Sequence, residues 1–330
     1  MADSTKKRTV LLTGGGGGGS IAVCRSLQSL GCYRVIMADA DPWAAGLLFG
    51  DAKYTVPFGN KPEFPSVIKE IIEKEEVDVL VPLVDEEIIP SLQLKKKGLR
   101  AKVLLPTEDF CNTSLDKYKC MEALIHVEGG PISPMGYLAV TENIENKLSF
   151  PMFAKPRFGR GSRGIQVIRD RDDLNGFLRI RRSSLENWVI QEYLEGIEYT
   201  VSVAVDKNNE LMGVIPKRVV NKRGVTITAY TENVPAIDRI CEIITRKLNP
   251  SGPFNVQTFV DASGKPFVFE INPRYSTTVA LTIAAGFNEV DILIRRLFDE
   301  EIQKPEIKWN LAMLRHWEQI YKYTDEMDLV

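Results

Sequence analysis

The sequence has few of the residues on which disulfide scaffolds and zinc sites depend. Its 330 residues include only 5 cysteines and 2 histidines. The cysteines form no Cys-x-x-Cys pair, so we expect neither a zinc cage nor a disulfide framework. Such sparse cysteine usage favours a reducing compartment, and we expect a cytoplasmic protein. The cysteines are Cys24, Cys32, Cys111, Cys120 and Cys241.

An excess of one charge and long apolar runs are lacking too. The formal net charge of −2 gives no basic excess for sequence-independent binding to nucleic acid. The first apolar run, residues 10–12, is too short for a signal peptide, and no stretch is long enough to span a bilayer. We therefore expect no nucleic-acid partner and no membrane association. A chain of 330 residues, 44% of them hydrophobic, has room for two or three domains with sizeable cores.

The N-terminal part of the chain predicts a parallel α/β sheet. A short apolar strand at residues 10–13 leads into an unbroken glycine run, residues 14–19. A helix over 21–30, which Ser20 is placed to cap, and a strand over 34–39 follow. Further strands are predicted at 53–57, 77–82 and 103–106, with an amphipathic helix near 64–76. Asp85 and Glu87 follow one of these strands, where ligands of open α/β sheets bind, although acidic residues at a helix N-terminus are commoner.

The glycine run supports two interpretations. It fits G-x-G-x-x-G at Gly14, Gly16 and Gly19, and Asp39 lies where the ribose-binding acid of a dinucleotide site falls. Six consecutive glycines satisfy any glycine spacing, however. The run is then a flexible turn that lets the backbone approach a ligand or another domain. An NAD-dependent dehydrogenase therefore stays open as an alternative.

A predicted hairpin late in the chain brings oxygen-bearing side chains together. Two β-rich runs flank the turn at residues 261–264. If Val260 pairs with Phe267, Gln257 lies opposite Glu270, and Asn272 shares the face of Glu270. One carboxylate and two amide oxygens suit Mg²⁺ when substrate phosphates complete its shell. The alternative is a hairpin whose polar face contacts only water.

The other face of the second strand argues against that alternative. It carries Phe267, Phe269 and Ile271, which predicts that this face is buried and that the polar face lines a cleft. Arg274, just beyond the strand, is placed to bind a phosphate as a planar donor.

The segments Asn255-Val-Gln257 and Glu270-Ile-Asn-Pro-Arg274 closely resemble the metal-binding segment of ATP-grasp domains, most closely the carbamoyl-phosphate-synthetase large-subunit type. The similarity runs from about Leu115 to Asp299 and is strongest at the hairpin. It implies an N-terminal parallel α/β (pre-ATP-grasp) domain followed by a two-lobed ATP-grasp fold. The implied boundaries are 1–112, 113–190 for the nucleotide lid, and 191–330 for the subdomain with the metal hairpin. ATP and Mg²⁺ (or Mn²⁺) are the implied cofactors.

The resemblance also assigns roles to residues. Loop 157–164 resembles the ATP-grasp phosphate loop, and residues 188–196 resemble the hinge that pairs with adenine. The residues implied at ATP are Lys117, Lys155, Gly161, Ser162, Gly164, Gln191, Glu192, Leu194, Glu198 and Lys217, with Arg218 as the alternative to Lys217. Gln257, Glu270 and Asn272 are implied as metal ligands, Arg274 and Lys155 as catalytic residues, and Gly16, Asp85 and Glu87 as contacts of the other substrate. From the residues alone, Lys117, in a predicted helix over 114–126, is equally an exposed lysine.

The reaction that the resemblance implies is ATP-dependent ligation of a small-molecule carboxylate to an amine through an acyl phosphate. Carbamoyl-phosphate-synthetase large subunits have two ATP-grasp units and this sequence has one, so a peptide-like or amino-acid ligase is the safer expectation. A non-catalytic ATP-binding sensor is a further alternative. The aromatic tail, residues 309–323, predicts packing on the body of the protein or on a second subunit, which leaves a homodimer open.

Overall fold

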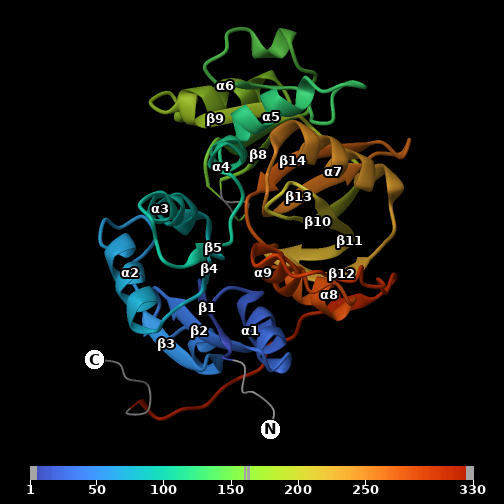
Figure 1. Ribbon diagram of the computed structural model, residues 1–330. Coiled ribbons are helices and arrows are strands. Elements are labelled where there is room, and N and C mark those ends of the chain that lie inside the picture. The colour runs from blue at the N-terminus through green and yellow to red at the C-terminus, as the bar shows by residue number, and fades with distance from the viewer. Residues whose placement is uncertain (1–5, 160, 162–163, 325–330) are drawn as a thin grey trace.

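The computed structural model describes residues 6–159, 161 and 164–324. Its strands form three sheets, of five, four and six strands, and each sheet carries its own helices. Figure 1 shows the N-terminal unit in blue, the four-stranded unit in green and the six-stranded unit mainly in orange. No helix in these ranges is long and apolar enough to cross a membrane.

The N-terminal unit is the predicted parallel α/β sheet, with strand order β3-β2-β1-β4-β5. Side chains alternate along β1, so Val10 and Leu12 pack toward α1 while Leu11 packs toward α2 and α3. The strands are β1 (Arg8–Thr13), β2 (Tyr33–Asp39), β3 (Ala52–Thr55), β4 (Val79–Val81) and β5 (Lys102–Val103). The helices are α1 (Ser20–Ser29), η1 (Ala45–Phe49, a 3₁₀ helix), α2 (Phe64–Lys74) and α3 (Asp85–Lys96).

Two predicted helix starts need correction. Ser20 does not cap α1: Gly19 is the N-cap, and the Ser20 hydroxyl donates to the Gly17 carbonyl at 2.7 Å. The helix predicted over 114–126 starts later: α4 (Glu108–Ser114) ends at the first predicted residue, and α5 (Lys117–Ile125) covers the rest of the range. Asp116 lies between them as the N-cap of α5 and accepts from the Tyr118 amide at 3.1 Å, so α5 starts at this cap.

The four-stranded sheet has the order β6-β9-β7-β8 and is antiparallel throughout. Helix α6 (Arg171–Ile180) packs Leu174 and Phe177 against it, and Asp170 caps α6 by accepting from the Asp173 amide at 2.9 Å. The strands are β6 (Gly136–Leu138), β7 (Met152–Pro156), β8 (Gln166–Ile168) and β9 (Trp188–Glu192), with 3₁₀ turns η2 (Ile144–Asn146) and η3 (Leu185–Asn187).

The six-stranded sheet has the order β14-β13-β10-β11-β12-β15. Val201 and Val203 of β10 pack toward α7, while Ala204, on the opposite face, joins the cluster that includes α8 and α9. The strands are β10 (Ile197–Val205), β11 (Leu211–Arg223), β12 (Val225–Thr231), β13 (Pro253–Val260), β14 (Pro266–Asn272) and β15 (Ala312–Leu314). The helices are α7 (Pro235–Leu248), α8 (Val279–Ala284) and α9 (Glu289–Leu297).

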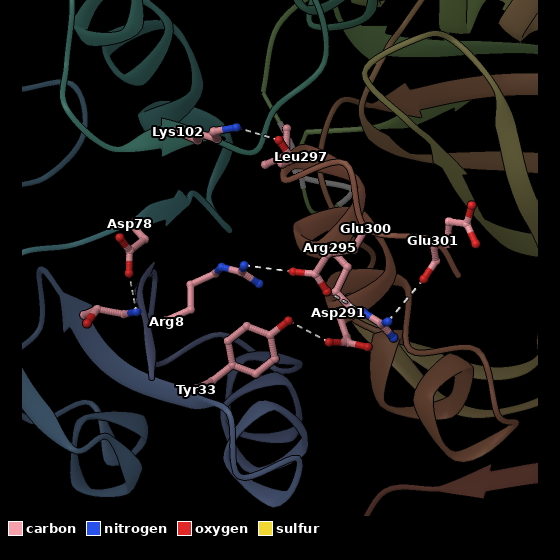
Figure 2. Close-up of polar contacts among 10 residues, drawn as sticks. Arg8, Tyr33, Asp78, Lys102, Asp291, Arg295, Leu297, Glu300 and Glu301 are labelled. Atoms are coloured by element: carbon pink, nitrogen blue, oxygen red, sulfur yellow. Dashed lines mark hydrogen bonds and ion pairs between the residues drawn. The ribbon is translucent and has the colours of Figure 1, made fainter. Parts of the chain in front are cut away.

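The first and last units share one apolar core. Val10 and Val35 of the parallel sheet lie in the same buried cluster as Val279 and Leu293 of α8 and α9. Polar contacts at its edge join the same two units, and Figure 2 shows the ion pair of Arg8 with Glu300 and the hydrogen bond of Tyr33 with Asp291. These contacts fix the N-terminal sheet against the C-terminal unit.

The aromatic tail packs on the body only in part. β15 adds to the edge of the sheet by pairing with β12. Beyond it, the side chains of Trp317 and Tyr321 are 90% and 86% exposed, so the predicted packing on the body is wrong for them. Packing on a second subunit stays a prediction.

The two ends of the glycine run pack closely against other parts of the chain, while Gly16, Gly17 and Gly18 in its middle are exposed. A Cβ on Gly46 of η1 would lie 1.8 Å from the Gly15 carbonyl oxygen, and a Cβ on Gly19 would lie 2.6 Å from a methyl of Val279. Asp39 accepts from the Gly16 amide at 2.7 Å, so its carboxylate braces the loop. Close approach of neighbouring segments therefore accounts for the glycines, which favours the turn interpretation over a dinucleotide site.

We expect Gly46→Ala to lower the free energy of unfolding by about 1–3 kcal/mol, because the new methyl overlaps the Gly15 carbonyl. Gly176→Ala is the matched control, since a Cβ there meets nothing within 4 Å and helix α6 gains about 0.5–1 kcal/mol. Urea denaturation followed by circular dichroism measures both. A Gly46→Ala protein as stable as the Gly176→Ala protein would contradict the close packing.

Candidate functional site

Strands β13 and β14 form the predicted hairpin, but near the turn their residues pair in a different register from the predicted one. Val260 pairs with Pro266, one residue before its predicted partner. The register then shifts by one residue at Phe269, so Gln257 still lies opposite Glu270 as predicted. A bulge of this kind places two residues of one strand opposite one of the other and turns the local side chains.

The bulge changes which aromatic side chains face the cavity. Ile271 lies in the buried cluster under α7, as predicted, and the bulge brings Val268 into the same cluster. The prediction that Phe269 is buried on that face is wrong, because its side chain lines a cavity together with Phe259, with ring centroids 5.1 Å apart. Phe267 is only half-buried.

Two adjoining cavities lie around this hairpin. The first, of about 520 Å³, has apolar walls from the four-stranded sheet, its loops and the hairpin: Phe153, Phe158, Ile165, Val167, Tyr193, Phe259 and Phe269. The second, of about 360 Å³, is mainly polar and includes Thr200, Thr226, Asn255 and Thr277. Five residues line both, so the cavities meet there: Gly161, Glu198, Lys222, Gln257 and Glu270.

Most residues that the sequence singled out line these cavities. The first is lined by Lys117, Lys155, Gly161, Gln191, Leu194, Glu198, Gln257 and Glu270, and Asn272 and Arg274 line the second. The three expected metal ligands, Gln257, Glu270 and Asn272, all face the second cavity. Gly164 and Glu192 line neither cavity, and Ser162 lies outside the described residues.

Lys155 is a buried cation at the wall of the first cavity. It is 5% exposed, and its Nζ donates to the Phe269 carbonyl at 2.8 Å, which ties β7 to the bulge. Burial lowers the pKa of Lys155 to about 8, while Glu270 raises it and Lys117 lowers it further. The lysine therefore shares a cavity with the carboxylate and holds its proton weakly when no anion is present.

The neighbouring loop is held by charged contacts. Asp116 binds Arg157 through two hydrogen bonds, of 2.9 and 2.7 Å. Lys117, the next residue, donates to the Gly159 carbonyl. The Asp-Lys pair at the start of α5 thus anchors the loop that borders the cavity.

Gln191 of β9 places an unsatisfied acceptor at the first cavity. The residue is 3% exposed, and no described residue hydrogen-bonds its buried Oε1. A buried acceptor without a partner costs free energy, so a bound donor at this point would be favoured. Glu192, by contrast, is satisfied within the protein, since its carboxylate accepts from the Met135 amide at 2.9 Å.

Lys222 is a cavity residue that sequence reasoning missed. It lies near the end of β11, lines both cavities and pairs with Glu198 at 2.8 Å. Strand β11 continues to Arg223, which carries Lys222 to the cavities. The signal in the sequence was Lys-Arg-Gly at 222–224, whose Gly224 takes a positive φ of 72° in the tight turn to β12.

Lys217 is fully buried and lines neither cavity, so its predicted contact with ATP needs correction. Its Nζ donates to the hydroxyls of Ser202 at 2.6 Å and Thr282 at 2.9 Å, and Ser202 in turn donates to Glu289 at 2.8 Å. Burial lowers the pKa of Lys217 and raises that of Glu289. The group holds the sheet to α8 and α9. Its alternative, Arg218, lines neither cavity either.

The three expected substrate contacts lie outside both cavities. Glu87 is buried and accepts from the Thr13 hydroxyl at 2.5 Å. The amide of Gly16 is bound by Asp39, and Asp85 forms an ion pair with Arg274. Contacts within the protein account for all three.

Comparisons with known proteins agree with this arrangement. The family model described as ATP-grasp in the biosynthetic pathway with Ter operon matches residues 184–319, and that of the D-ala D-ala ligase C-terminus matches 134–233. A third, the PylC-like N-terminal domain, matches 10–103. The chain belongs to the ATP-grasp superfamily. The four-stranded and six-stranded units, which border the cavities, thus lie in segments that ATP-grasp models match.

Curated relatives of this ATP-grasp protein are carbamoyl phosphate synthase large chains. That of Clostridium perfringens is 27% identical over 249 residues, which is 71% of this chain and 23% of the relative. That of Clostridium botulinum (strain Alaska E43) is 29% identical over 218 residues, 60% of this chain and 20% of the relative. The chain therefore spans less than a quarter of the length of these relatives.

Solved structures show the same fold at lower identity. An ADP complex of N5-carboxyaminoimidazole ribonucleotide synthetase has a TM-score of 0.74 at 14% identity and covers 94% of this chain and 82% of its own. A biotin carboxylase–β-γ-ATP complex from Campylobacter jejuni has a TM-score of 0.72 at 16% identity, with 90% of this chain and 73% of its own covered. The ATP-grasp fold is thus shared along nearly the whole chain.

We expect Lys217→Met to lower the free energy of unfolding by about 3–5 kcal/mol, because Glu289 then stays buried without its cation. Adding Glu289→Gln should restore much of that stability. Since Lys217 lines neither cavity, the folded variant should bind nucleotide within about twofold of the wild type. Denaturant titration and calorimetry measure these quantities, and a stable variant that has lost nucleotide binding would contradict the structural role.

Proposed function

We propose that this chain is an ATP- and Mg²⁺-dependent ligase that activates a carboxylate as an acyl phosphate for attack by an amine. One observation carries the proposal: the oxygen donors of the hairpin and the buried cation Lys155 border one continuous space, where the two cavities meet. The three-block division at 1–112, 113–190 and 191–330 belongs to this proposal. Strand β9 continues to Glu192, two residues past the second boundary.

The first cavity suits a nucleoside. Its aromatic and aliphatic walls would cover a flat base, and the unpaired Gln191 Oε1 would accept from an exocyclic amino group such as that of adenine. Glu198 lines both cavities, so its carboxylate is available to a ribose hydroxyl between base and phosphates. The two similar solved structures hold ADP and β-γ-ATP, which agrees with this assignment.

The donor set at the hairpin suits a divalent cation that arrives with phosphates. Glu270 supplies a carboxylate, and Gln257 and Asn272 supply amide oxygens. Within the described ranges, no cluster of three His, Cys, Asp or Glu residues is placed to hold a metal by itself. Mg²⁺ commonly binds through one or two carboxylates and completes its shell with phosphate oxygens and water. The cation would offset charge on the transferring phosphoryl group.

The chain's own side chains would bind and align the reactants. Lys155 and Lys117 line the first cavity and would neutralise the phosphates of ATP, while Arg274 lines the second, where the acid would lie. Lys222, where the two cavities meet, would contact ATP in place of Lys217. A substrate carboxylate would attack the γ-phosphorus, releasing ADP, and an amine would then displace phosphate from the acyl phosphate. Alignment and charge neutralisation are what such a transfer requires of a protein.

The second cavity indicates the kind of acid. Its walls carry hydroxyls of Thr200, Thr226 and Thr277 and the amide of Asn255, with Arg274 as a cation. A small polar carboxylate, such as an amino acid or hydroxy acid, matches this lining. The amine is a small molecule as well.

The two alternatives fare differently. A dehydrogenase would need the glycine run for its cofactor, and η1, Asp39 and α8 already contact that run at Gly15, Gly16 and Gly19. A non-catalytic ATP sensor would keep the same cavities, and only turnover distinguishes it from a ligase.

ADP release from Mg-ATP, screened over a panel of amino acids, hydroxy acids and amines, tests the ligase. We expect Glu270→Gln to abolish turnover because the three expected metal ligands lose their one carboxylate, with an unchanged circular dichroism spectrum. Asp261→Asn, in the exposed turn of the same hairpin, is the control and should retain activity. A wild-type rate in Glu270→Gln would refute the proposal. A protein that binds Mg-ATP but releases ADP with no tested acid and amine would also refute it, and would favour the sensor.

Affinity for Mg-ATP should fall as the pH rises above about 8, because free Lys155 then loses its proton and the phosphates need the protonated form. Binding an anion raises the pKa of the lysine, so binding takes up a proton in this range. We expect the dissociation constant to rise up to about tenfold per pH unit. Calorimetry between about pH 7 and 9.5 measures it, and Lys155→Arg, which stays charged, should give a flatter profile. A flat wild-type profile would contradict the assignment.

A further inference from the structure

Asp85 does not line either cavity, yet it contacts a residue that does. We propose that Asp85 is a positioning residue: it holds the Arg274 guanidinium so that one nitrogen, Nη2, is left for the anionic group in the second cavity. The proposal rests on the ligase function proposed above and adds to it a contribution from the N-terminal unit.

The hydrogen bonds of Arg274 divide its guanidinium into a fixed part and a free part. Nε donates to the Asp85 carboxylate, and Nη1 donates to the Tyr275 carbonyl at 3.0 Å. No described residue binds Nη2, although Arg274 lines the second cavity. The side chains of Arg274 and Asp85 are only 12% and 13% exposed, so solvent screens this ion pair little.

Asp85 is held rigidly with respect to the N-terminal sheet. It is the first residue of α3, which follows β4, and the sheet order reverses between β1 and β4. Ligand sites of open α/β sheets lie at such a reversal. Glu87, two residues on, accepts from the hydroxyl of Thr13 at the end of β1 and so ties the start of α3 to β1.

Arg274 is held equally firmly with respect to the candidate metal site. Its amide donates to the carbonyl of Asn272 at 2.8 Å, which closes a tight turn directly after β14. The guanidinium is thus braced from two units, by Asp85 from one side and by the end of the metal hairpin from the other. An arginine braced in this way keeps a single orientation, and preorganised donors stabilise developing charge without reorganisation.

This brace should affect the chemical step more than nucleotide binding. Most residues expected at the nucleotide, among them Gln191, Glu198 and Lys155, line the first cavity, where Arg274 is absent from the lining. Losing Asp85 leaves Arg274 in place but free to change rotamer. We therefore expect kcat to fall while the KM for ATP stays nearly constant.

Asp85→Asn tests the proposal, because it removes the charge and keeps the size of the side chain. We expect kcat to fall roughly 10- to 100-fold, as is typical when an orienting partner is lost, with the KM for ATP within about twofold. Glu300→Gln is the matched control: it also breaks an ion pair between the N-terminal and C-terminal units, with Arg8, and Figure 2 shows this pair. Neither residue of that pair lines the cavities, so the control should keep the wild-type kcat.

A double-mutant cycle with Arg274→Lys shows whether Asp85 acts through the guanidinium. In the Arg274→Lys background, Asp85→Asn should cost little further activity. Equal losses of kcat in Asp85→Asn and Glu300→Gln would mean that Asp85 only holds the two units together. If Asp85→Asn still causes its full loss of kcat in the Arg274→Lys background, Asp85 does not act through Arg274.

A binding measurement separates this proposal from the ligase assignment. Aluminium fluoride with Mg-ADP imitates the transferring phosphoryl group, and Asp85→Asn should weaken its binding about tenfold while leaving Mg-ADP affinity unchanged. If the wild type binds this complex but ligates nothing, the ligase assignment fails and Asp85 is still tested. Unchanged fluoride binding in Asp85→Asn overturns the positioning role, and a wild type that binds no Mg-ATP overturns both proposals.

Discussion

The pairing of Gln257 with Glu270 across β13 and β14 is the contact on which the candidate site depends. It exists because the bulge at Phe269 corrects a register that starts one residue off at the turn. Without that extra residue, Glu270 would lie on the opposite face, toward the apolar cluster under α7. The same bulge places the Phe269 ring in the first cavity and its carbonyl against the Lys155 ammonium. One irregularity thus sets the metal donors, an aromatic wall and a cation.

Lys155 and Lys217 show that burial of a lysine does not by itself decide its function. Lys155 and Lys217 both have their pKa lowered by burial. Lys155 has one hydrogen bond, to a carbonyl, and borders open space, so it can still bind an anion. Lys217 is satisfied by Ser202 and Thr282 and is fully buried where α8 and α9 pack on the sheet. What differs is what packs over each lysine, and therefore what it can reach.

The N-terminal sheet contributes to the site through its geometry. Its apolar face continues into the core around α8 and α9, which fixes its orientation relative to the hairpin. The point where its strand order reverses then lies beside the end of β14, and Asp85 meets Arg274 there. The glycine run is part of this fit, because close approach of η1 and α8 leaves no room for side chains at several of its positions. Its glycines serve packing between units.

Local patterns in the sequence were sufficient to predict the parallel sheet, the late hairpin and the oxygen-bearing residues along it, because strand alternation and turn residues are short-range properties. The side chains expected at the nucleotide, among them Lys155 and Gln191, also came from local motifs and resemblance. The bulge, the burial of Lys217, the reach of Lys222 and the Asp85–Arg274 pair could not be predicted in this way. Each depends on which distant strand or helix packs against the residue, and periodicity along one strand does not contain that information. Only the tertiary structure decided which cations face the cavity.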